Sequence, residues 1–269
     1  MPPRLPRSEG SWLDQQDWSS FDQHGFLSVG RWLDETALSA LQRRMDDIML
    51  GRIAYDDMMM QLDGGGAYDE LPEQTKGFKG PTVMYRKIEG LEKDPIFFEY
   101  MRHPLMRECC ARIYGAMADI SVYRAMFMNK PAAKGTTLPW HQDGGEGWGL
   151  DRDPLLTVWL ALDPSRASNG CVEVIDGSHR LGLLSKFGHT LSAEHVREHC
   201  HAAKVVELEA DPGEVFLLHN FLIHRSGINP TGQPRRAFSV CYMDARTRRR
   251  DGKSFPFIFS LNPAVANAS

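Results

Sequence analysis

Apolar residues recur at helical spacing in the first third of the chain. One such pattern covers residues 13–24 and stops at Gly25, and a second covers residues 34–50, where an aspartate can cap the first turn. A third pattern covers residues 104–116, with a proline in its first turn and a glycine near its end. These features predict three helices in a helical N-terminal part over about residues 1–118.

Between the second and third predicted helices, residues 51–80 lack a regular pattern. An irregular stretch of this length in a compact domain is usually a lid, a binding loop or a disordered segment. Met58, Met59 and Met60 lie inside it, and packing into gaps of the core is favoured over a binding surface for them. Residues 51–80 are therefore a candidate for a loop that covers a site.

After about residue 119 the pattern changes to short runs of β-branched and aromatic residues, separated by Pro, Gly, Asn and Asp. Such runs predict the strands of an antiparallel sandwich or barrel. We expect a single domain that is mainly β with flanking α: a jelly-roll core over about 119–245, packed against the N-terminal helices, and a tail over 246–269. The predicted strands cover residues 120–129, 155–162, 171–175, 205–209, 214–218, 223–228 and 237–243.

Length and charge narrow the choice of function. The 269 residues suit one large domain. A formal net charge of -4 gives no sign of a nucleic-acid partner, and the lack of a run of about 18 apolar residues argues against a membrane span. The one basic cluster consists of arginines at positions 246 and 248–250, for which a solvated surface turn is favoured over an anion site. The expected partner is a small-molecule substrate.

The cysteines and the N-terminus bear on the compartment. Five cysteines without a CxxC pair argue against a disulfide framework and against a thiolate zinc site. Residues 1–12 lack the apolar core of a secretory signal. These features lead us to expect a cytoplasmic protein.

A candidate metal site begins in the sequence Trp140-His141-Gln142-Asp143. Side chains two residues apart on an extended strand point to the same face, so His141 and Asp143 can meet at one point. Two histidines and one carboxylate leave three positions open on an octahedral iron, as non-haem Fe(II) oxygenases require. The motif is short, and the same residue types also suit a turn or a helix cap.

The third ligand is predicted further along the chain. His224 follows a hydrophobic run, and Arg235 comes soon after it. A buried guanidinium offers a rigid fork of donors that matches a carboxylate, as a dicarboxylate cosubstrate would require. His219 is a rival third ligand, but His224 is favoured because it directly precedes the Arg-Ser-Gly sequence and this arginine. Histidines 189, 195, 199 and 201 lie in a segment typical of an exposed helix or loop, which disfavours zinc there.

In these motifs the chain resembles the phytanoyl-CoA dioxygenase family of Fe(II)/2-oxoglutarate oxygenases. The resemblance runs from about Lys87 to Asp244, and the order and spacing of the pieces match as well. It implies a double-stranded β-helix, the jelly-roll or cupin-like fold. The matching pieces are NKP at 129–131, WHQD at 140–143, VWLALD at 158–163, NGCVEVIDGSH at 169–179 and HRSGINPTGQPRR at 224–236.

The resemblance also implies roles for individual residues. His141, Asp143 and His224 would be the catalytic residues that hold Fe(II). Because an aspartate stands where halogenating relatives carry a small residue, the chain is expected to oxygenate rather than halogenate. The residues expected to hold or flank 2-oxoglutarate are Arg235 at its distal carboxylate, Ser226 beside it, Lys87, Trp159 and Gln142.

The implied function is a dioxygenase that uses 2-oxoglutarate and O2, hydroxylates an aliphatic C–H of a small molecule, and releases succinate and CO2. Two alternatives stay open: a non-catalytic jelly-roll module that binds a ligand, and a metal-dependent isomerase or hydrolase on the same scaffold. The substrate is not predicted, and residues 51–80 and 144–153 would decide it. Acidic and aromatic residues in the second loop favour a polar or cationic group over a long acyl chain; they are Glu146, Trp148, Asp151 and Asp153.

Overall fold

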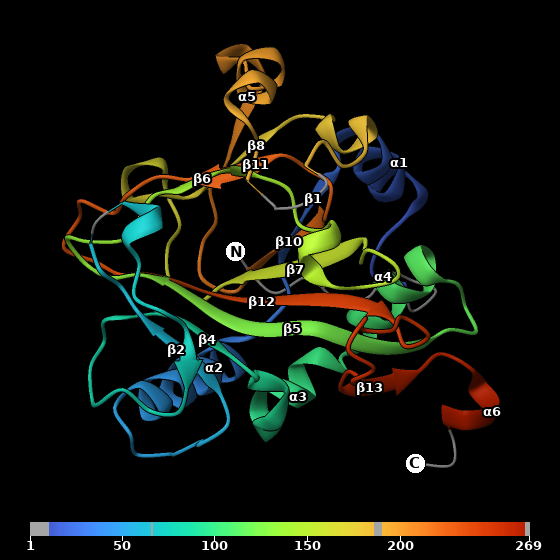
Figure 1. Cartoon of the computed structure of the whole chain (residues 1–269). Coiled ribbons are helices and arrows are strands. Elements are labelled where there is room, and N and C mark those ends of the chain that lie inside the picture. The colour runs from blue at the N-terminus through green and yellow to red at the C-terminus, as the bar shows by residue number, and fades with distance from the viewer. Residues whose placement is uncertain (1–10, 66, 186–189, 267–269) are drawn as a thin grey trace.

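Two antiparallel sheets face each other in the computed structural model, which describes residues 11–65, 67–185 and 190–266 (Figure 1). The large sheet has the strand order β1-β10-β7-β12-β5-β4-β2-β3, with β13 added to β5, and the small sheet has the order β6-β11-β8-β9. The large sheet contains β1 (Phe26–Arg31), β2 (Met59–Leu62), β3 (Thr75–Lys76), β4 (Tyr85–Glu89), β5 (Asp119–Lys130), β7 (Leu156–Ala161), β10 (Glu214–His219), β12 (Arg235–Asp244) and β13 (Phe257–Ser260). The small sheet contains β6 (Leu138–His141), β8 (Val172–Ile175), β9 (Val205–Leu208) and β11 (His224–Ser226).

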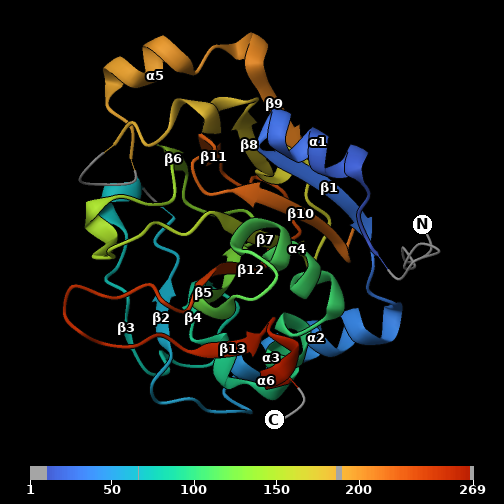
Figure 2. The same cartoon turned by 90° about the vertical axis from the view of Figure 1, so that its right-hand side faces the viewer.

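The helices cover the outer face of the large sheet and one end of the small sheet. Figures 1 and 2 show α2 and α3 below the large sheet, whereas α5 projects above the small sheet. This arrangement of two facing sheets is the predicted jelly roll, so the predicted fold class is confirmed. The helices are α1 (Gln15–His24), α2 (Glu35–Met49), α3 (Pro95–Met101), α4 (Pro104–Tyr114), α5 (Ala193–His199) and α6 (Pro263–Ala266).

Strand β7 shows how the large sheet separates two environments. It lies between β10 and β12, and every one of its residues is buried. Because successive side chains on a strand point to opposite faces, Val158 and Leu160 pack among the helices, whereas Thr157 and Trp159 face the space between the sheets. One face of the sheet thus anchors the helices, and the other carries the polar and aromatic groups of a cavity.

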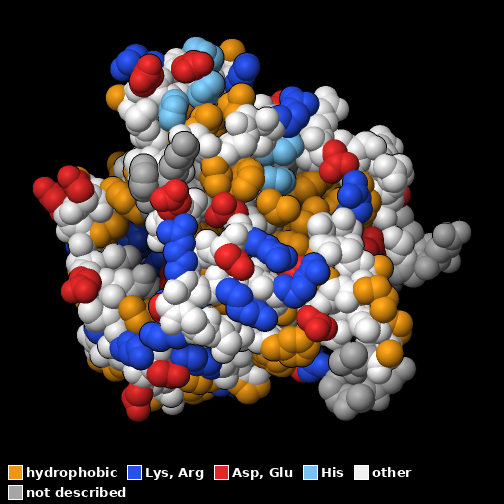
Figure 3. Space-filling view, turned by 45° about the vertical axis from the view of Figure 1, so that its right-hand side comes forward, with side chains coloured by type: hydrophobic (Ala, Val, Ile, Leu, Met, Phe, Trp, Pro, Cys, Tyr) orange, Lys and Arg blue, Asp and Glu red, His pale blue; other side chains and the backbone are white. Residues whose placement is uncertain are grey.

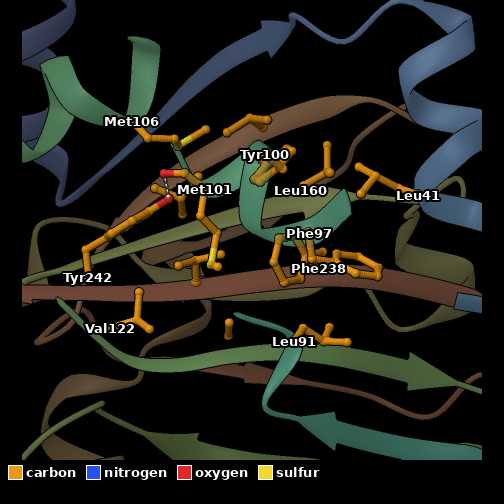
Figure 4. Close-up of a cluster of buried hydrophobic side chains, with 14 of the residues drawn as sticks. Leu41, Leu91, Phe97, Tyr100, Met101, Met106, Val122, Leu160, Phe238 and Tyr242 are labelled. Atoms are coloured by element: carbon orange, nitrogen blue, oxygen red, sulfur yellow. Dashed lines mark hydrogen bonds between the residues drawn. The ribbon is translucent and has the colours of Figure 1, made fainter. Parts of the chain in front are cut away.

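The main hydrophobic core fills the space between the large sheet and the helices (Figure 4). Phe97 and Tyr100 of α3 meet Phe238 of β12 with ring centroids 4.8 and 5.2 Å apart, in edge-on contacts. The hydroxyl of Tyr242 donates to the backbone oxygen of Met101 at 2.9 Å, so the phenol buried in this core is satisfied. The core holds the large sheet rigid on the side away from the cavity.

The helix ends confirm the predicted capping residues. The Asp34 side chain accepts a hydrogen bond from the backbone N–H of Ala37 at the start of α2. Gly25 ends α1 in the left-handed conformation, with φ of 78°. The predicted helix over 104–116 is observed as α4, and each predicted strand has a counterpart in the two sheets.

The structure corrects the expectation that residues 51–80 are irregular. They contain β2 and β3, which extend the large sheet beyond β4. Met58 and Met60 are buried, as predicted for residues that fill gaps in the core. The N-terminal part, predicted to be helical, also contributes strand β1. The predicted tail contributes strand β13. These strands are too short to show a periodic pattern in the sequence, and they form because the sheet offers them an edge.

Two surface clusters have local structural roles. Arg246 is paired with Asp244, and Arg249 is paired with Asp251 at 2.9 Å, which supports a surface turn for the basic cluster. In Figure 3 histidine side chains gather at the top of the molecule, over α5. Among the described residues no metal-binding group forms there, and His189 lies outside the described residues.

None of the described helices combines the length and apolar character that a membrane crossing requires.

Candidate metal centre

A cavity lies between the two sheets. One wall of the cavity is formed by strands β4, β5, β7, β10 and β12 of the large sheet. The opposite wall is formed by strands β6, β8 and β11 of the small sheet. Apolar side chains such as Met126, Met128 and Leu218 alternate there with polar ones. A concave site with an apolar lining and a few convergent polar groups is the usual form of a small-molecule site.

The two predicted histidine ligands lie opposite each other in the small sheet. His141 ends β6 and His224 begins β11, and the two are direct partners in the antiparallel register. Their ring centroids are 3.9 Å apart. The pairing of β6 with β11 therefore brings together two residues that are far apart in the sequence.

Backbone carbonyls orient both imidazoles. The Nδ1–H of His141 donates to the oxygen of Pro139, and the Nδ1–H of His224 donates to the oxygen of Leu222, each at 2.9 Å. A proton on Nδ1 leaves the lone pair on Nε2, which is the form that binds a metal. Both rings are thus set in the same tautomer by the residue two positions earlier in the chain.

Asp143 completes the group, although it lies beyond the strand. Strand β6 ends at His141, and the backbone N–H of Asp143 donates to the oxygen of Asn220 at 2.8 Å. One carboxylate oxygen of Asp143 is 4.0 Å from Nε2 of His224. Nitrogen and oxygen atoms from the two histidines and the aspartate all lie within 4.8 Å of one another, which suits a single ion.

The rival histidine, His219, lies elsewhere. Its Nδ1 accepts a hydrogen bond from the backbone N–H of Phe221 at 3.1 Å, and its ring contacts Phe21 and His179. Burial lowers the pKa of His219 to about 4, so the ring is neutral at physiological pH. His219 is part of the packing between α1 and β10, outside the group of three.

Arg235 lies deep in the cavity. Its side chain is only 3% exposed, and one Nη donates to the backbone oxygen of Gly170 at 2.9 Å. Its guanidinium carbon is 6.0 Å from the centroid of the Trp159 ring. Within the described residues the Nε–H of Arg235 has no hydrogen-bond partner, and burial lowers the pKa of this guanidinium to about 10. A buried cation with an unused donor fits an incoming carboxylate.

The structure places three of the other predicted pocket residues on the same cavity. Ser226 lies on β11, two residues after His224, and Trp159 lies on β7. Lys87 lies on β4, and its Nζ is 2.6 Å from a carboxylate oxygen of Glu89. Burial, followed by the charge of Arg124, lowers the pKa of Lys87. Trp159 is near Arg235, whereas Ser226 and Lys87 face the cavity from other strands.

Gln142 is the exception, because its side chain points away from the cavity. It is fully buried, and its amide nitrogen donates to the backbone oxygens of Gly182 and Phe221 at 2.8 and 2.7 Å. Its amide oxygen accepts from the N–H of Leu184 at 2.8 Å. The expectation that Gln142 flanks the cosubstrate is wrong, since a residue between two inward-facing neighbours faces outward in extended chain.

Gln142 should therefore matter for stability. Replacing it by alanine leaves two carbonyls and one N–H, all partly buried, without this partner, and we expect the free energy of unfolding to fall by about 1–3 kcal/mol. Urea unfolding followed by circular dichroism measures this change. The exposed Gln16 offers a matched control, because Gln16→Ala should change stability by less than about 0.5 kcal/mol. Equal effects of the two substitutions would contradict the role given to Gln142.

Several residues of the site were not singled out in the sequence. Asn220 is buried, accepts from the Thr157 hydroxyl at 2.8 Å, and holds the backbone of Asp143. Lys130 and Arg124 line the cavity from β5. For Arg124 and Lys130 the sequence does contain a signal. Side chains two residues apart on β5 point to the same face, so both residues share the face of Met126 and Met128.

The fold and the group of three candidate ligands define a class of protein. Two facing sheets that enclose two histidines, an aspartate and a buried arginine are the architecture of enzymes that depend on iron and 2-oxoglutarate. The family follows from the sequence: the profile of the phytanoyl-CoA dioxygenase (PhyH) family matches residues 21–237. The chain belongs to this family, and it is an enzyme of the 2-oxoglutarate-dependent dioxygenase class.

Individual relatives agree with this assignment. A phytanoyl-CoA dioxygenase 1 of Oryza sativa subsp. japonica is 30% identical, covering 87% of this chain and 90% of the relative. A probable phytanoyl-CoA dioxygenase of Caenorhabditis elegans is 26% identical, covering 87% of this chain and 76% of the relative.

Solved structures share the fold at lower identity. EctD from S. alaskensis, solved with 2-oxoglutarate and 5-hydroxyectoine, superposes with a TM-score of 0.72 at 21% identity, covering 93% of this chain and 84% of EctD. The non-haem α-ketoglutarate-dependent carbocyclase SnoK from nogalamycin biosynthesis superposes with a TM-score of 0.70 at 19% identity. The match covers 97% of this chain and 98% of SnoK.

Proposed function

We propose that this protein is an Fe(II)- and 2-oxoglutarate-dependent dioxygenase that hydroxylates an aliphatic C–H of a small molecule, with release of succinate and CO2. The observation that carries the proposal is the pairing of a three-residue metal group with a buried arginine in one cavity. A structural metal site would not need a buried cation beside it, whereas a dicarboxylate cosubstrate does.

His141, Asp143 and His224 would hold the iron. Two imidazoles and one carboxylate suit Fe(II) and leave half of an octahedral coordination sphere for other molecules. Iron with bound 2-oxoglutarate and O2 supplies the oxidising chemistry, and the protein supplies placement. The hydrogen bonds from Nδ1 to backbone oxygens keep the Nε2 lone pairs of both rings aimed at the ion.

Arg235 and its neighbours would bind the distal carboxylate of 2-oxoglutarate. The guanidinium keeps its charge at physiological pH, and the unused Nε–H supplies a donor that a carboxylate can satisfy. Ser226 adds a hydroxyl from β11, and Trp159 contributes one wall. Lys87 would assist from β4. The apolar side chains Met128, Leu138 and Val172 limit the access of water to this end.

The experiment measures succinate release by the iron-loaded protein in the presence of 2-oxoglutarate, O2 and a panel of metabolites. Mass spectrometry of the product identifies the outcome: hydroxylation adds one oxygen atom, whereas ring closure or epimerisation does not. The distinction matters because the structural relatives include a carbocyclase and an epimerase. A protein that binds zinc, binds no 2-oxoglutarate and releases no succinate would instead be a ligand-binding module.

Lys130 makes the proposal testable through pH. Lys130 pairs with Arg235 in the register of β5 and β12, and its Nζ donates to the backbone oxygen of Thr136 at 2.7 Å. Burial, then the charges of Arg235 and Arg86, lower the pKa of Lys130 to about 6, and Asp63 opposes them. The amine is therefore mostly neutral at pH 8 in the empty protein.

A carboxylate bound at Arg235 should raise the pKa of Lys130 again, so binding takes up a proton above about pH 6. The affinity for 2-oxoglutarate should therefore fall as pH rises, by up to about tenfold per pH unit. Titration calorimetry at pH 8 in buffers of different ionisation enthalpy measures the proton uptake. Lys130→Met should abolish this uptake, and unchanged uptake in that variant would assign the proton to another group.

A further inference from the structure

The charge of the cavity wall exceeds what iron and 2-oxoglutarate require. Among the described residues of the wall, Asp143 carries the only carboxylate. The two positive charges of Fe(II), the negative charge of this aspartate and the two negative charges of 2-oxoglutarate would leave a net charge of about minus one. The basic residues of the wall are Arg86, Lys87, Arg124, Lys130, Arg225 and Arg235, of which Lys130 becomes charged only when an anion binds beside it.

Most of these cations are already compensated or serve the deep end of the cavity. Arg225 is bonded to Glu173 through Nε and Nη2 at 3.0 and 2.7 Å. Lys87 lies 2.6 Å from Glu89. Arg86 donates to the amide oxygen of Gln61 at 2.9 Å and lies near enough to Lys130 to affect its pKa, so it belongs to the deep end.

Arg124 differs from the other cations in its pairing. Within the described residues its ion pair is with Glu89, at 3.9 Å, and the same carboxylate oxygen is 2.6 Å from Lys87. One carboxylate is thus shared by two cations and lies closer to the lysine. The Arg124 side chain is 24% exposed and lines the cavity, so its guanidinium can be reached by a ligand.

Two aromatic rings hold the Arg124 guanidinium in place. A bulge in β5 opposite Cys241 and Tyr242 sets Tyr123 beside Arg124, with the guanidinium carbon 4.8 Å from the centroid of the Tyr123 ring. The same carbon is 4.6 Å from the centroid of Trp148, which stacks on Tyr123 at 4.2 Å. An arginine fixed by such contacts loses little side-chain entropy when it binds an anion.

Arg124 is also far from the expected place of 2-oxoglutarate. It is six residues from Lys130 along β5, which corresponds to about 20 Å of strand. A five-carbon dicarboxylate held at Arg235 is about 6 Å long at roughly 1.5 Å per bond, so it cannot reach Arg124. Burial opposes the shift, but the charge of Glu89, and after it those of Tyr123 and Asp143, raise the pKa of Arg124, so Arg124 lies near Asp143 at the metal end of the cavity. Figure 3 shows Lys and Arg side chains inside a hollow at the left of the face in view.

We propose that Arg124, supported by Tyr123 and Trp148, binds an anionic group of the primary substrate, which is therefore an organic acid with a carboxylate or phosphate. The proposal rests on the proposed function and extends it to a substrate class. The acidic loop residues do not oppose it, because Asp153 accepts the N–H of Gly145 at 2.7 Å and Asp151 accepts the N–H of Arg248 at 2.8 Å. The cavity charge favours an anion, in contrast to the cationic or polar group suggested by the loop sequence.

The test uses four benzene derivatives of similar size: benzoate, phenyl phosphate, the neutral benzamide and the cationic benzylammonium. Each is titrated by calorimetry into anaerobic Fe(II) protein saturated with 2-oxoglutarate, so that the Arg235 end is filled. We expect benzoate or phenyl phosphate to bind at least about tenfold more tightly than benzamide. The tighter of the two anions identifies whether the substrate group is a carboxylate or a phosphate.

Substitution then assigns the preference to one residue. Arg124→Gln should remove the advantage of the anion over benzamide, and Arg124→Lys should retain part of it. The matched control is Arg102→Gln, because Arg102 also lies over an aromatic ring, 5.5 Å from the centroid of Phe98, but outside the cavity. The control should keep the preference. Tighter binding of benzylammonium, an anion preference that survives Arg124→Gln, or no binding of either anion at millimolar concentration overturns the proposal.

The outcome is separable from that of the proposed function. Affinity for 2-oxoglutarate is measured on the same samples, and a large loss in Arg124→Gln would place Arg124 in the cosubstrate site and overturn the substrate proposal alone. If the wild-type protein binds no 2-oxoglutarate, the proposed function fails. The anion titration is then repeated in Arg235→Met, which lacks the competing deep arginine, and still decides the role of Arg124.

Discussion

Replacing Arg235 by methionine is expected to raise the concentration of 2-oxoglutarate needed for half-maximal succinate release by at least about 100-fold. Truncating one partner of a buried, hydrogen-bonded charge pair usually costs 2–5 kcal/mol, and a factor of ten corresponds to about 1.4 kcal/mol. Lys130 is the partner of Arg235 across the strands, but a single ammonium group cannot replace the planar fork of donors that a guanidinium offers to a carboxylate. The loss should therefore fall on cosubstrate binding.

The adjacent Arg236 is the matched control for this substitution. It points to the opposite side of β12, where it is bonded to Asp163 and Asp46 at 2.7 Å each. Arg236→Met should lower stability and leave the affinity for 2-oxoglutarate within about threefold of the wild type. Circular dichroism verifies that both variants fold. Normal cosubstrate affinity in Arg235→Met would favour a metal-dependent isomerase or hydrolase instead.

Replacing His224 by alanine is expected to remove iron binding and to reduce succinate release to background. Loss of a contact behind a metal ligand costs up to about 100-fold in affinity, so loss of the ligand itself should cost at least that much. Iron content after desalting and succinate formation with 2-oxoglutarate measure the two effects. The remaining His141 and Asp143 would offer only two donors to the ion.

His219 supplies the control for His224, because it was the rival ligand in the sequence. It packs beside Phe21 and outside the group of three, so His219→Gln should retain iron at the wild-type ratio even where stability falls. Retention of iron by His224→Ala, together with loss of iron in His219→Gln, would reverse the assignment of the third ligand.

The fold was largely predictable from local patterns. Runs of β-branched and aromatic residues bounded by turn residues identify β5, β7, β10 and β12, because each runs through the middle of the sheet where both faces are covered. Strands β1, β2, β3, β4 and β13 are not predicted from the sequence: β2, β3, β4 and β13 have five residues or fewer, and β1 lies at the edge of the sheet. Their formation depends on which neighbour is available, and a single sequence does not contain that information.

The grouping of the three candidate ligands could be predicted from the sequence, whereas much of their surroundings could not. His141, Asp143 and His224 are predicted as ligands because each lies in a motif of several residues, and the structure brings them together as a group that could hold an ion. Gln142 was assigned to the cavity on the strength of the same motif, although strand alternation places it outside. Arg124 is not predicted as a site residue, because its contact with Trp148 joins strand β5 to a loop distant in sequence. Contacts between distant segments were the missing information.

The tautomers of His141 and His224 are set by peptide carbonyls rather than by side chains. A carbonyl oxygen is retained whatever residue stands at positions 139 and 222, so the tautomers of the two candidate metal-ligating histidines are insulated from substitutions nearby. The walls of the cavity can therefore diverge, in nature or in a laboratory library, while the reactivity of the centre is preserved. A scaffold built in this way can acquire new substrates without having to rebuild its metal chemistry.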